Sequence, residues 1–233
     1  MIEWNKVIYA DCMDPEVGLP SLPDNSIDLS ITDPPYNKGF NGYNGFKGSY
    51  HTRKKKIKYY SDEMGSEDYS NWCESWFNEL KRICKTIIIS VGITNLNLWY
   101  NITDPNDIFY GINRMGAFGS GIAVFNKVEP WLFYGKCKQQ FTQNIFLYSR
   151  KEKHDCIHPC PRSIRVIENI IHHLKPESVI DPFMGSGTTA EVCTKLGIPW
   201  LGYEINEVYS QDINKRLKNC VKEPQIKLLE EFL

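Results

Sequence analysis

Apolar positions along the chain follow two alternating patterns, short runs of β-type residues and longer stretches with helical spacing. Strands are predicted at 6–10, 27–32, 86–91, 178–180 and 200–203, and two more, at 122–125 and 144–148, are interpreted as an antiparallel pair. Helices are predicted from Ser66 to Ile83, from Ser163 to Leu174, from the glycines before Thr188 to Gly197, and from Tyr209 to Cys220. Such alternation is typical of an α/β fold, with a doubly wound, mainly parallel sheet and helices on both faces.

Length and composition narrow the class of protein. The 233 residues suffice for one domain, 1–233, and 42% hydrophobic with 24% charged residues is ordinary for a soluble protein. No stretch approaches the roughly 20 apolar residues that cross a bilayer, and the N-terminal segment has no apolar signal core. We therefore expect a cytoplasmic protein with no membrane partner. The segments 101–121 and 127–143 are interpreted as irregular, and about 127–143 as a short recognition segment.

Four acidic residues stand where predicted strands end. They are Asp11, Asp33, Asp181 and Glu204. The carboxyl ends of parallel strands meet at one edge of an open sheet, and ligands bind at that edge. The four acids together therefore predict a ligand site there, which one acid alone would not.

A glycine turn follows one of these strands, in the segment Asp181-Pro-Phe-Met-Gly-Ser-Gly-Thr-Thr189. Glycine permits backbone conformations that side chains forbid and lets a ligand approach closely. A phosphate loop would need a lysine before its last Ser or Thr, and this segment has none. With Glu204 at the end of the next strand, the pattern favours a nucleoside site in which the acid accepts hydrogen bonds from ribose hydroxyls.

A second motif, Asp33-Pro34-Pro35-Tyr36, follows another strand. Two prolines fix the backbone and remove two amide donors. Carbonyl oxygens and the Asp33 carboxylate remain as acceptors beside an aromatic ring. Such a site suits a planar base that carries an amino group.

The two motifs together resemble those of the DNA amino-methyltransferases, which form N6-methyladenine or N4-methylcytosine. DPPY precedes DPFMGSGTT here, as in the permuted β class of that family. Other matching segments are Ala10-Asp11-Cys12, the segment HPCPRS from His158 to Ser163, and Gly202-Tyr203-Glu204-Ile205 followed by Tyr209. The HPCPRS segment departs from the family pattern, since Cys160 and Arg162 stand where Thr and Lys are common. The resemblance covers the chain from about residue 6 to 220.

The resemblance implies S-adenosylmethionine as cofactor and assigns roles to single residues. Its cofactor-binding set is Asp11, Cys12, Cys160, Arg162, Asp181, Phe183, Gly185, Ser186, Gly187, Thr188, Glu204 and Ile205. Its catalytic set is Asp33, Pro34, Pro35 and Tyr36. Asp33 and the Pro34 carbonyl would accept hydrogen bonds from the target amine, and Tyr36 would stack on a base flipped out of the duplex.

A basic, aromatic segment leaves directly from DPPY. Residues 47–58 contain six basic residues and no acid, namely Lys47, Arg53, Lys54, Lys55, Lys56 and Lys58. A solvated surface is the ordinary interpretation of such a run. Its position next to the target-base motif instead favours a mobile DNA-contacting loop at about 37–62, although the net charge of the chain is only −1.

The eight cysteines form no dense framework, so we expect mostly reduced thiols. His154, Cys156, His158 and Cys160 alternate, but zinc ligands are usually paired at a spacing of two to four residues with a second, distant pair. We therefore expect no metal.

The predicted function is site-specific methylation of adenine N6 in DNA. Cytosine N4 is the main alternative. An RNA base methyltransferase and a catalytically silent subunit are the others. With little room for a recognition domain, we expect a short target sequence, or a second copy or second subunit that helps to recognise the target.

Overall fold

The computed structural model describes residues 2–37, 64–113, 119–120, 125–137, 143–148 and 162–220. The strands are β1 (Lys6–Ile8), β2 (Ile27–Thr32), β3 (Cys84–Ser90), β4 (Asp107–Asn113), β5 (Gly119–Ser120), β6 (Phe125–Asn126), β7 (Val128–Gly135), β8 (Ile145–Tyr148), β9 (Val179–Asp181) and β10 (Trp200–Tyr203). The helices are α1 (Ser66–Ile83), α2 (Leu96–Ile102), α3 (Ile164–Leu174), α4 (Thr188–Leu196) and α5 (Ser210–Cys220). Short 3-10 turns are η1 (Leu19–Ser21), η2 (Ile93–Asn95) and η3 (Glu207–Tyr209).

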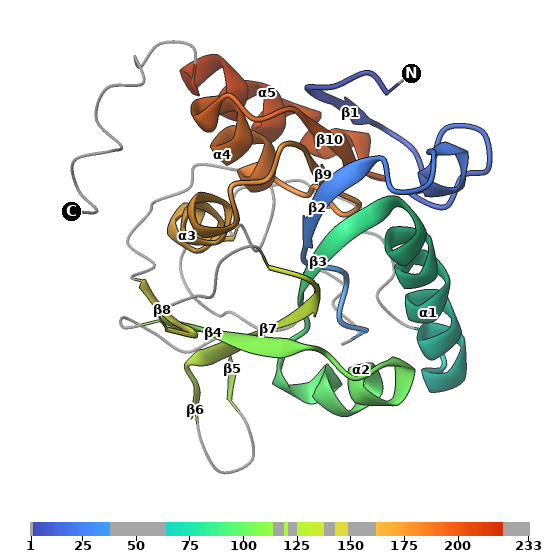
Figure 1. Ribbon diagram of the computed structural model, residues 1–233, viewed down its shortest axis with the longest axis vertical. Helices are drawn as coiled ribbons and strands as arrows, with labels where there is room; N and C mark the ends of the chain where they lie inside the picture. Colours follow the sequence, from blue (N-terminus) through green and yellow to red (C-terminus); the bar gives the residue numbers. More distant parts are fainter. Residues whose placement is uncertain are drawn as a thin grey trace, which may run out of the picture.

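Eight strands form one twisted sheet in the order β1-β10-β9-β2-β3-β7-β4-β8, which Figure 1 shows running through the molecule. All neighbouring strands pair in parallel except β7, which is antiparallel to both β3 and β4. Because β7 runs the other way, its first residues lie at the edge where β2 and β3 end. β5 and β6 pair separately.

Helices cover both faces of the sheet, with α1 and α2 on one side and α3, α4 and α5 on the other (Figure 1). Each face has its own core. Trp76, Phe77 and Leu80 of α1 are almost fully buried against the first face. Ile167 and Ile170 of α3 are buried against the second, together with side chains of α4. The expected α/β fold, with a mainly parallel sheet between two helical layers, is confirmed.

Two expectations about the middle of the chain are wrong. Segments 101–121 and 127–143 are not irregular, because they contain β4 and β7, and β7 lies inside the sheet. The strand 144–148 forms as β8, and its partner among the described strands is β4, with which it pairs in parallel. Of the segment 122–125, Phe125 begins the two-residue β6, and 121–124 lie outside the described residues.

The described helices include none that is both long and apolar enough to cross a membrane.

Candidate active site

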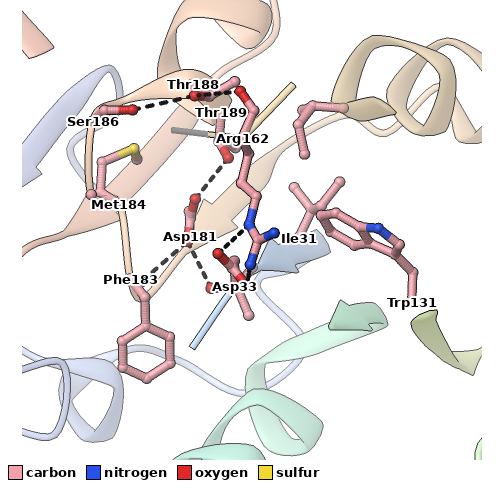
Figure 2. A pocket seen from close by; sticks show the side chains of 13 residues that line it. Ile31, Asp33, Trp131, Arg162, Asp181, Phe183, Met184, Ser186, Thr188 and Thr189 are labelled. Atoms are coloured by element: carbon pink, nitrogen blue, oxygen red, sulfur yellow. Dashed lines mark hydrogen bonds and ion pairs between the residues drawn. The ribbon is translucent and has the colours of Figure 1, made fainter. Parts of the chain in front are cut away.

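The carboxyl ends of β2, β9 and β10 meet at one edge of the sheet, as the acidic residues predict. Asp33 follows β2, Asp181 ends β9 and Glu204 follows β10. A pocket opens beside them, and Figure 2 shows its lining. It extends from Ile31, Asp33 and Trp131 on one side to the turn at 183–186 and helix α4 on the other. DPPY and the glycine turn therefore border the same cavity.

Asp181 organises the glycine turn from within. Its carboxylate accepts hydrogen bonds from the hydroxyls of Thr32 and Thr189, both at 2.7 Å, and from the Phe183 amide at 3.1 Å. Burial raises the pKa of Asp181 to about 6 despite these bonds. Both carboxylate oxygens are thus used to fix the turn. Asp181, expected in the cofactor-binding set, therefore positions the turn.

Glu204 closes the other side of the turn. Its carboxylate accepts hydrogen bonds from the amides of Gly185 at 2.8 Å and Asn206 at 2.7 Å. Glu204 is only 8% exposed, and burial raises its pKa to about 7. A buried carboxylate that accepts only amide hydrogen bonds from the described residues suits the hydroxyl donors of a ribose. Glu204 and the turn therefore fit the nucleoside part of S-adenosylmethionine.

Gly185 and Gly187 have positive φ angles of 54° and 81°, which disfavour any side chain. At Gly187 the fold adds a second constraint. A Cβ there would lie 3.0 Å from Cγ1 of Ile213, on α5. Substitution of Gly187 would therefore disturb the packing of α5 on the turn, whether or not a ligand is bound. Packing against α5 is thus a second reason for this glycine, beside the close approach of the cofactor that the sequence predicts.

The backbone of DPPY is held by two polar side chains. The Tyr69 hydroxyl donates to the Pro35 carbonyl at 2.7 Å, and the Asn95 amide donates to the Tyr36 carbonyl at 3.0 Å. Within the described part of the chain, nothing donates to the Pro34 carbonyl. That oxygen keeps its capacity to accept a hydrogen bond from a ligand.

The Tyr36 hydroxyl lies inside a polar network. It donates to Oδ1 of Asp33 at 2.6 Å and shares a hydrogen bond with Oγ of Ser90 at 2.7 Å. Burial raises the pKa of Tyr36 well above its ordinary value. Gly92 lies against the ring, since a Cβ there would be 3.0 Å from Cε2 of Tyr36. Tyr36 is thus fixed at both its hydroxyl and its ring.

Arg162, expected in the cofactor-binding set, also contacts the DPPY motif. Its guanidinium donates to both carboxylate oxygens of Asp33, to Oε1 of Glu129 and, at 2.6 Å, to the Tyr36 hydroxyl. Figure 2 shows the side chain reaching from the level of α4 down to Asp33. The Arg162 carbonyl accepts from the Thr188 hydroxyl at 3.5 Å, and the residue lines the same pocket as the glycine turn. The structure therefore places Arg162 with the DPPY motif.

Three other residues of the cofactor-binding set lie at the β1–β10 end of the site. Asp11 is exposed, and its carboxylate accepts a hydrogen bond from the Met13 amide at 2.9 Å. Cys12 is 4% exposed and packs into the core on the α1 face. Ile205 is 50% exposed beside Glu204.

Several sequence predictions fall outside the described residues. These are Cys160, the basic residues Lys47, Arg53, Lys54, Lys55, Lys56 and Lys58, and the alternating His and Cys residues at 154–160. The ends of segment 38–63 are nevertheless defined. Asn37 donates to the Met64 carbonyl at 3.0 Å and accepts from the Met64 amide at 2.7 Å, so the segment begins and ends beside Tyr36. Among described residues no His, Cys, Asp or Glu cluster suits a metal ion.

The sequence did not reveal Glu129, Trp131 or Ser90 as site residues. Glu129 is 5% exposed, and its Oε2 accepts from the Trp131 indole at 3.3 Å. Both come from the first half of β7, and Ser90 pairs with Trp131 in the sheet. No motif marks them, and only the antiparallel direction of β7 brings them to this edge.

Comparisons with known proteins agree with this geometry. The model of a DNA methylase family, the N6/N4 methylases, matches residues 27–117 and 127–215. Type II methyltransferase M.HinfI of Haemophilus influenzae is 26% identical over 94% of this chain and 70% of its own length. Type II methyltransferase M.HpaI of Haemophilus parainfluenzae is 26% identical over 88% of this chain and 73% of its own.

Solved structures share the fold. A complex of M1.HpyAVI with SAM has a TM-score of 0.60 at 19% identity, and covers 91% of this chain and 98% of its own. The cytosine-N4-specific PvuII DNA methyltransferase has a TM-score of 0.65 at 17% identity, with 94% and 93% covered. The family match spans most of the chain and includes both motifs that border the pocket. This chain therefore belongs to the N6/N4 DNA methylase family.

Proposed function

We propose that the protein transfers a methyl group from S-adenosylmethionine to N6 of adenine in DNA, as a β-class enzyme in which DPPY precedes the glycine turn. The observation that carries this proposal is the shared pocket. Asp33, with its two acceptor oxygens, lies in the same cavity as the turn at 183–186 and α4. An amine donor and a methyl donor would therefore meet there.

The acceptors around Asp33 address the difficulty of the reaction. The lone pair of an exocyclic amine is conjugated into the base, which makes the nitrogen a poor nucleophile. Asp33 and the Pro34 carbonyl, by accepting the two amine hydrogens, favour a pyramidal nitrogen whose lone pair points away from the ring. They also stabilise the positive charge that develops on nitrogen. The bound cofactor supplies the electrophilic methyl group.

The chain's remaining contribution is positioning. Asp181, Thr32 and Thr189 fix the turn that holds one substrate. Tyr69 and Asn95 fix the DPPY backbone that holds the other. Holding both reactants in line removes the entropy cost of bringing them together in the reactive geometry. This effect supplies much of the acceleration in such reactions.

Adenine is preferred because an Asp before Pro-Pro-Tyr in this family is associated with adenine and a Ser with cytosine. N4 of cytosine is the second candidate, and the fold shared with the cytosine-N4-specific PvuII enzyme favours it. The relatives named Type II methyltransferases support a place in a restriction-modification system. The segment from about 37 to 62 is proposed to contact DNA, with its anchored ends next to Tyr36.

Burial limits the proposed recognition segment. Residues 129–134 of β7 are buried in the sheet and are not available to DNA, and residues 138–142 of the segment 127–143 lie outside the described residues. We propose that a second copy or subunit adds to target recognition.

Transfer of labelled methyl groups from S-adenosylmethionine tests the proposal. It is measured with duplex DNA, with RNA of the same sequence, and in a blank without nucleic acid. We expect transfer to DNA. Asp33→Asn keeps the shape but weakens the acceptor, and should lower the rate by about 100-fold or more while cofactor affinity stays near wild type. Asp24→Asn, which removes a carboxylate paired with Arg82 outside the pocket, is the matched control. Transfer to RNA alone, or an Asp33→Asn variant as fast as wild type, would contradict the proposal.

A further inference from the structure

Arg162 joins two carboxylates that come from different strands. Nε and Nη2 donate to Oδ2 and Oδ1 of Asp33, and Nη1 donates to Oε1 of Glu129. The Arg162 side chain is 19% exposed, that of Asp33 24% and that of Glu129 5%. The planar guanidinium presents donors in a fixed fork. One cation thus lies between the two acids at the wall of the pocket.

This arrangement conflicts with the role of Asp33 toward an amine. Oδ1 already accepts from Arg162 and from the Tyr36 hydroxyl, and Oδ2 accepts from Arg162. A carboxylate oxygen accepts up to two hydrogen bonds, so a target amine can bind Oδ2 beside Arg162, whereas an amine that binds Oδ1 must displace a guanidinium N–H or the Tyr36 hydroxyl. A guanidinium N–H displaced in this way needs a new acceptor, because a partly buried charged donor left without one is costly.

The target base itself carries such an acceptor. In adenine the ring nitrogen N1, and in cytosine N3, lies next to the carbon that bears the amine, and has a lone pair but no hydrogen. The edge of the base thus offers a donor and an acceptor side by side. Asp33 and the adjacent Arg162 N–H offer the complementary acceptor and donor. Enzymes that act on flipped bases read this Watson–Crick edge with hydrogen bonds.

We propose that Arg162 is a specificity-determining residue that donates a hydrogen bond to the ring nitrogen next to the target amine, while Glu129 retains the guanidinium through Nη1. The inference rests on the proposed function. Guanine N1 and thymine N3 carry a hydrogen. Their N–H groups would face a guanidinium N–H, and two donors cannot form a hydrogen bond. The pair Asp33 and Arg162 therefore selects bases with an amine next to an unprotonated ring nitrogen.

Glu129 makes this exchange feasible. Its second oxygen accepts from the Trp131 indole, and the carboxylate is buried in β7, so its position is fixed by the sheet. The guanidinium also lies 5.6 Å from the centroid of the Tyr36 ring. Arg162 can lose one bond to Asp33 and remain held at the pocket wall.

The test compares the target base with its deaza analogue in duplex oligonucleotides, 1-deazaadenine for adenine or 3-deazacytosine for cytosine. The analogue keeps the amine and loses the ring acceptor. Wild type should lose about 10- to 100-fold in kcat/KM on the analogue, the effect of one hydrogen bond to a charged group. Arg162→Met should be slower than wild type on the natural base and should lose no more than about twofold on changing to the analogue, since the bond is already absent.

Two further variants guard the interpretation. Arg82→Met removes a guanidinium paired with Asp24 and Glu79 outside the pocket, and should keep the wild-type ratio between natural base and analogue. Arg162→Lys keeps a cation between the two acids but lacks the planar guanidinium. It should lower the ratio of kcat/KM on the natural base to kcat/KM on the analogue, and it provides the test if Arg162→Met does not fold.

If the wild type methylates the natural oligonucleotide, three results would overturn this inference and leave the proposed function intact. The first is an analogue penalty that persists in both Arg162 variants. The second is a wild type with no penalty. The third is an Arg162→Met variant faster than wild type on the natural base, which would make Arg162 only a block on Asp33. A wild type that transfers no methyl to the natural base would overturn the proposed function, and the inference with it.

Discussion

At the residue scale, Glu204 has an ionisation that the fold moves close to neutral pH. Burial raises its pKa to about 7, from an ordinary value of 4.5. The native state therefore binds this proton more tightly than the unfolded chain does. The contribution of Glu204 to stability falls as the pH rises from about 4.5 to about 7. Near pH 7 and above, the ionised form of buried Glu204 lowers the free energy of unfolding. The same ionised carboxylate can accept hydrogen bonds from hydroxyl groups.

Cofactor affinity should follow this ionisation. Ribose hydroxyls donate to the ionised carboxylate, so binding lowers the pKa of Glu204 and releases a proton. S-adenosylmethionine should then bind about tenfold more weakly at pH 6 than at pH 8. Calorimetry at pH 6, 7 and 8 measures this dependence.

Glu204→Gln is the control, because it leaves Asp181 and the ionisation of the ligand unchanged. The variant should bind more weakly than wild type at pH 8 and lose the part of the pH dependence that Glu204 causes. Identical pH profiles for the two proteins would show that Glu204 does not hold the ribose.

At the scale of elements, the sequence predicts the strand ends better than the sheet itself. Asp33, Asp181 and Glu204 lie where the apolar runs before them indicate, because each run is short, buried and followed by a turn. The glycine turn and α4 are equally local, and Gly197 ends α4 as expected. These features depend on neighbours in the chain, so the sequence is sufficient to find them.

Strand β7 shows what a local pattern cannot provide. Its sequence carries Glu129 and Pro130 before the apolar run, and proline usually argues against a central strand. The Pro130 carbonyl still accepts from the Val91 amide, just past the end of β3, at 3.2 Å, so the proline removes only one donor at the end of this ladder. The antiparallel direction of β7 depends on long-range pairing. Glu129, and with it the position of Arg162, could not be predicted without that direction.

At the scale of the whole molecule, charge is distributed unevenly although the chain carries a net charge of only −1. The acids at the ligand edge of the sheet would repel a phosphate backbone. The basic residues from Lys47 to Lys58 belong to the segment that begins and ends beside Tyr36. We therefore expect this segment to provide most of the sequence-independent attraction to DNA.

Replacing Lys54, Lys55 and Lys56 together with Gln should weaken DNA binding and flatten its salt dependence. The slope of log affinity against log salt should fall by up to about 0.9 for each lost phosphate contact. The matched control replaces Lys6, Lys81 and Lys85, which lie where β1 begins, where α1 ends and where β3 begins, at the opposite edge of the sheet. A folded Lys54–Lys56 variant with the wild-type slope would assign the run to solvated surface.

The identity of the methylated nucleoside tests the central claim most directly. DNA treated with the protein and S-adenosylmethionine is digested to nucleosides, and the products are identified by mass spectrometry against authentic standards. We predict N6-methyldeoxyadenosine, which should form about 100-fold more slowly, or slower still, when Asp33→Asn replaces the wild type. N4-methyldeoxycytidine as the only product would contradict the adenine assignment but keep the amine mechanism. Methylation at a ring carbon would contradict the mechanism itself, because that reaction needs a covalent nucleophile that Asp33-Pro34-Pro35-Tyr36 does not provide.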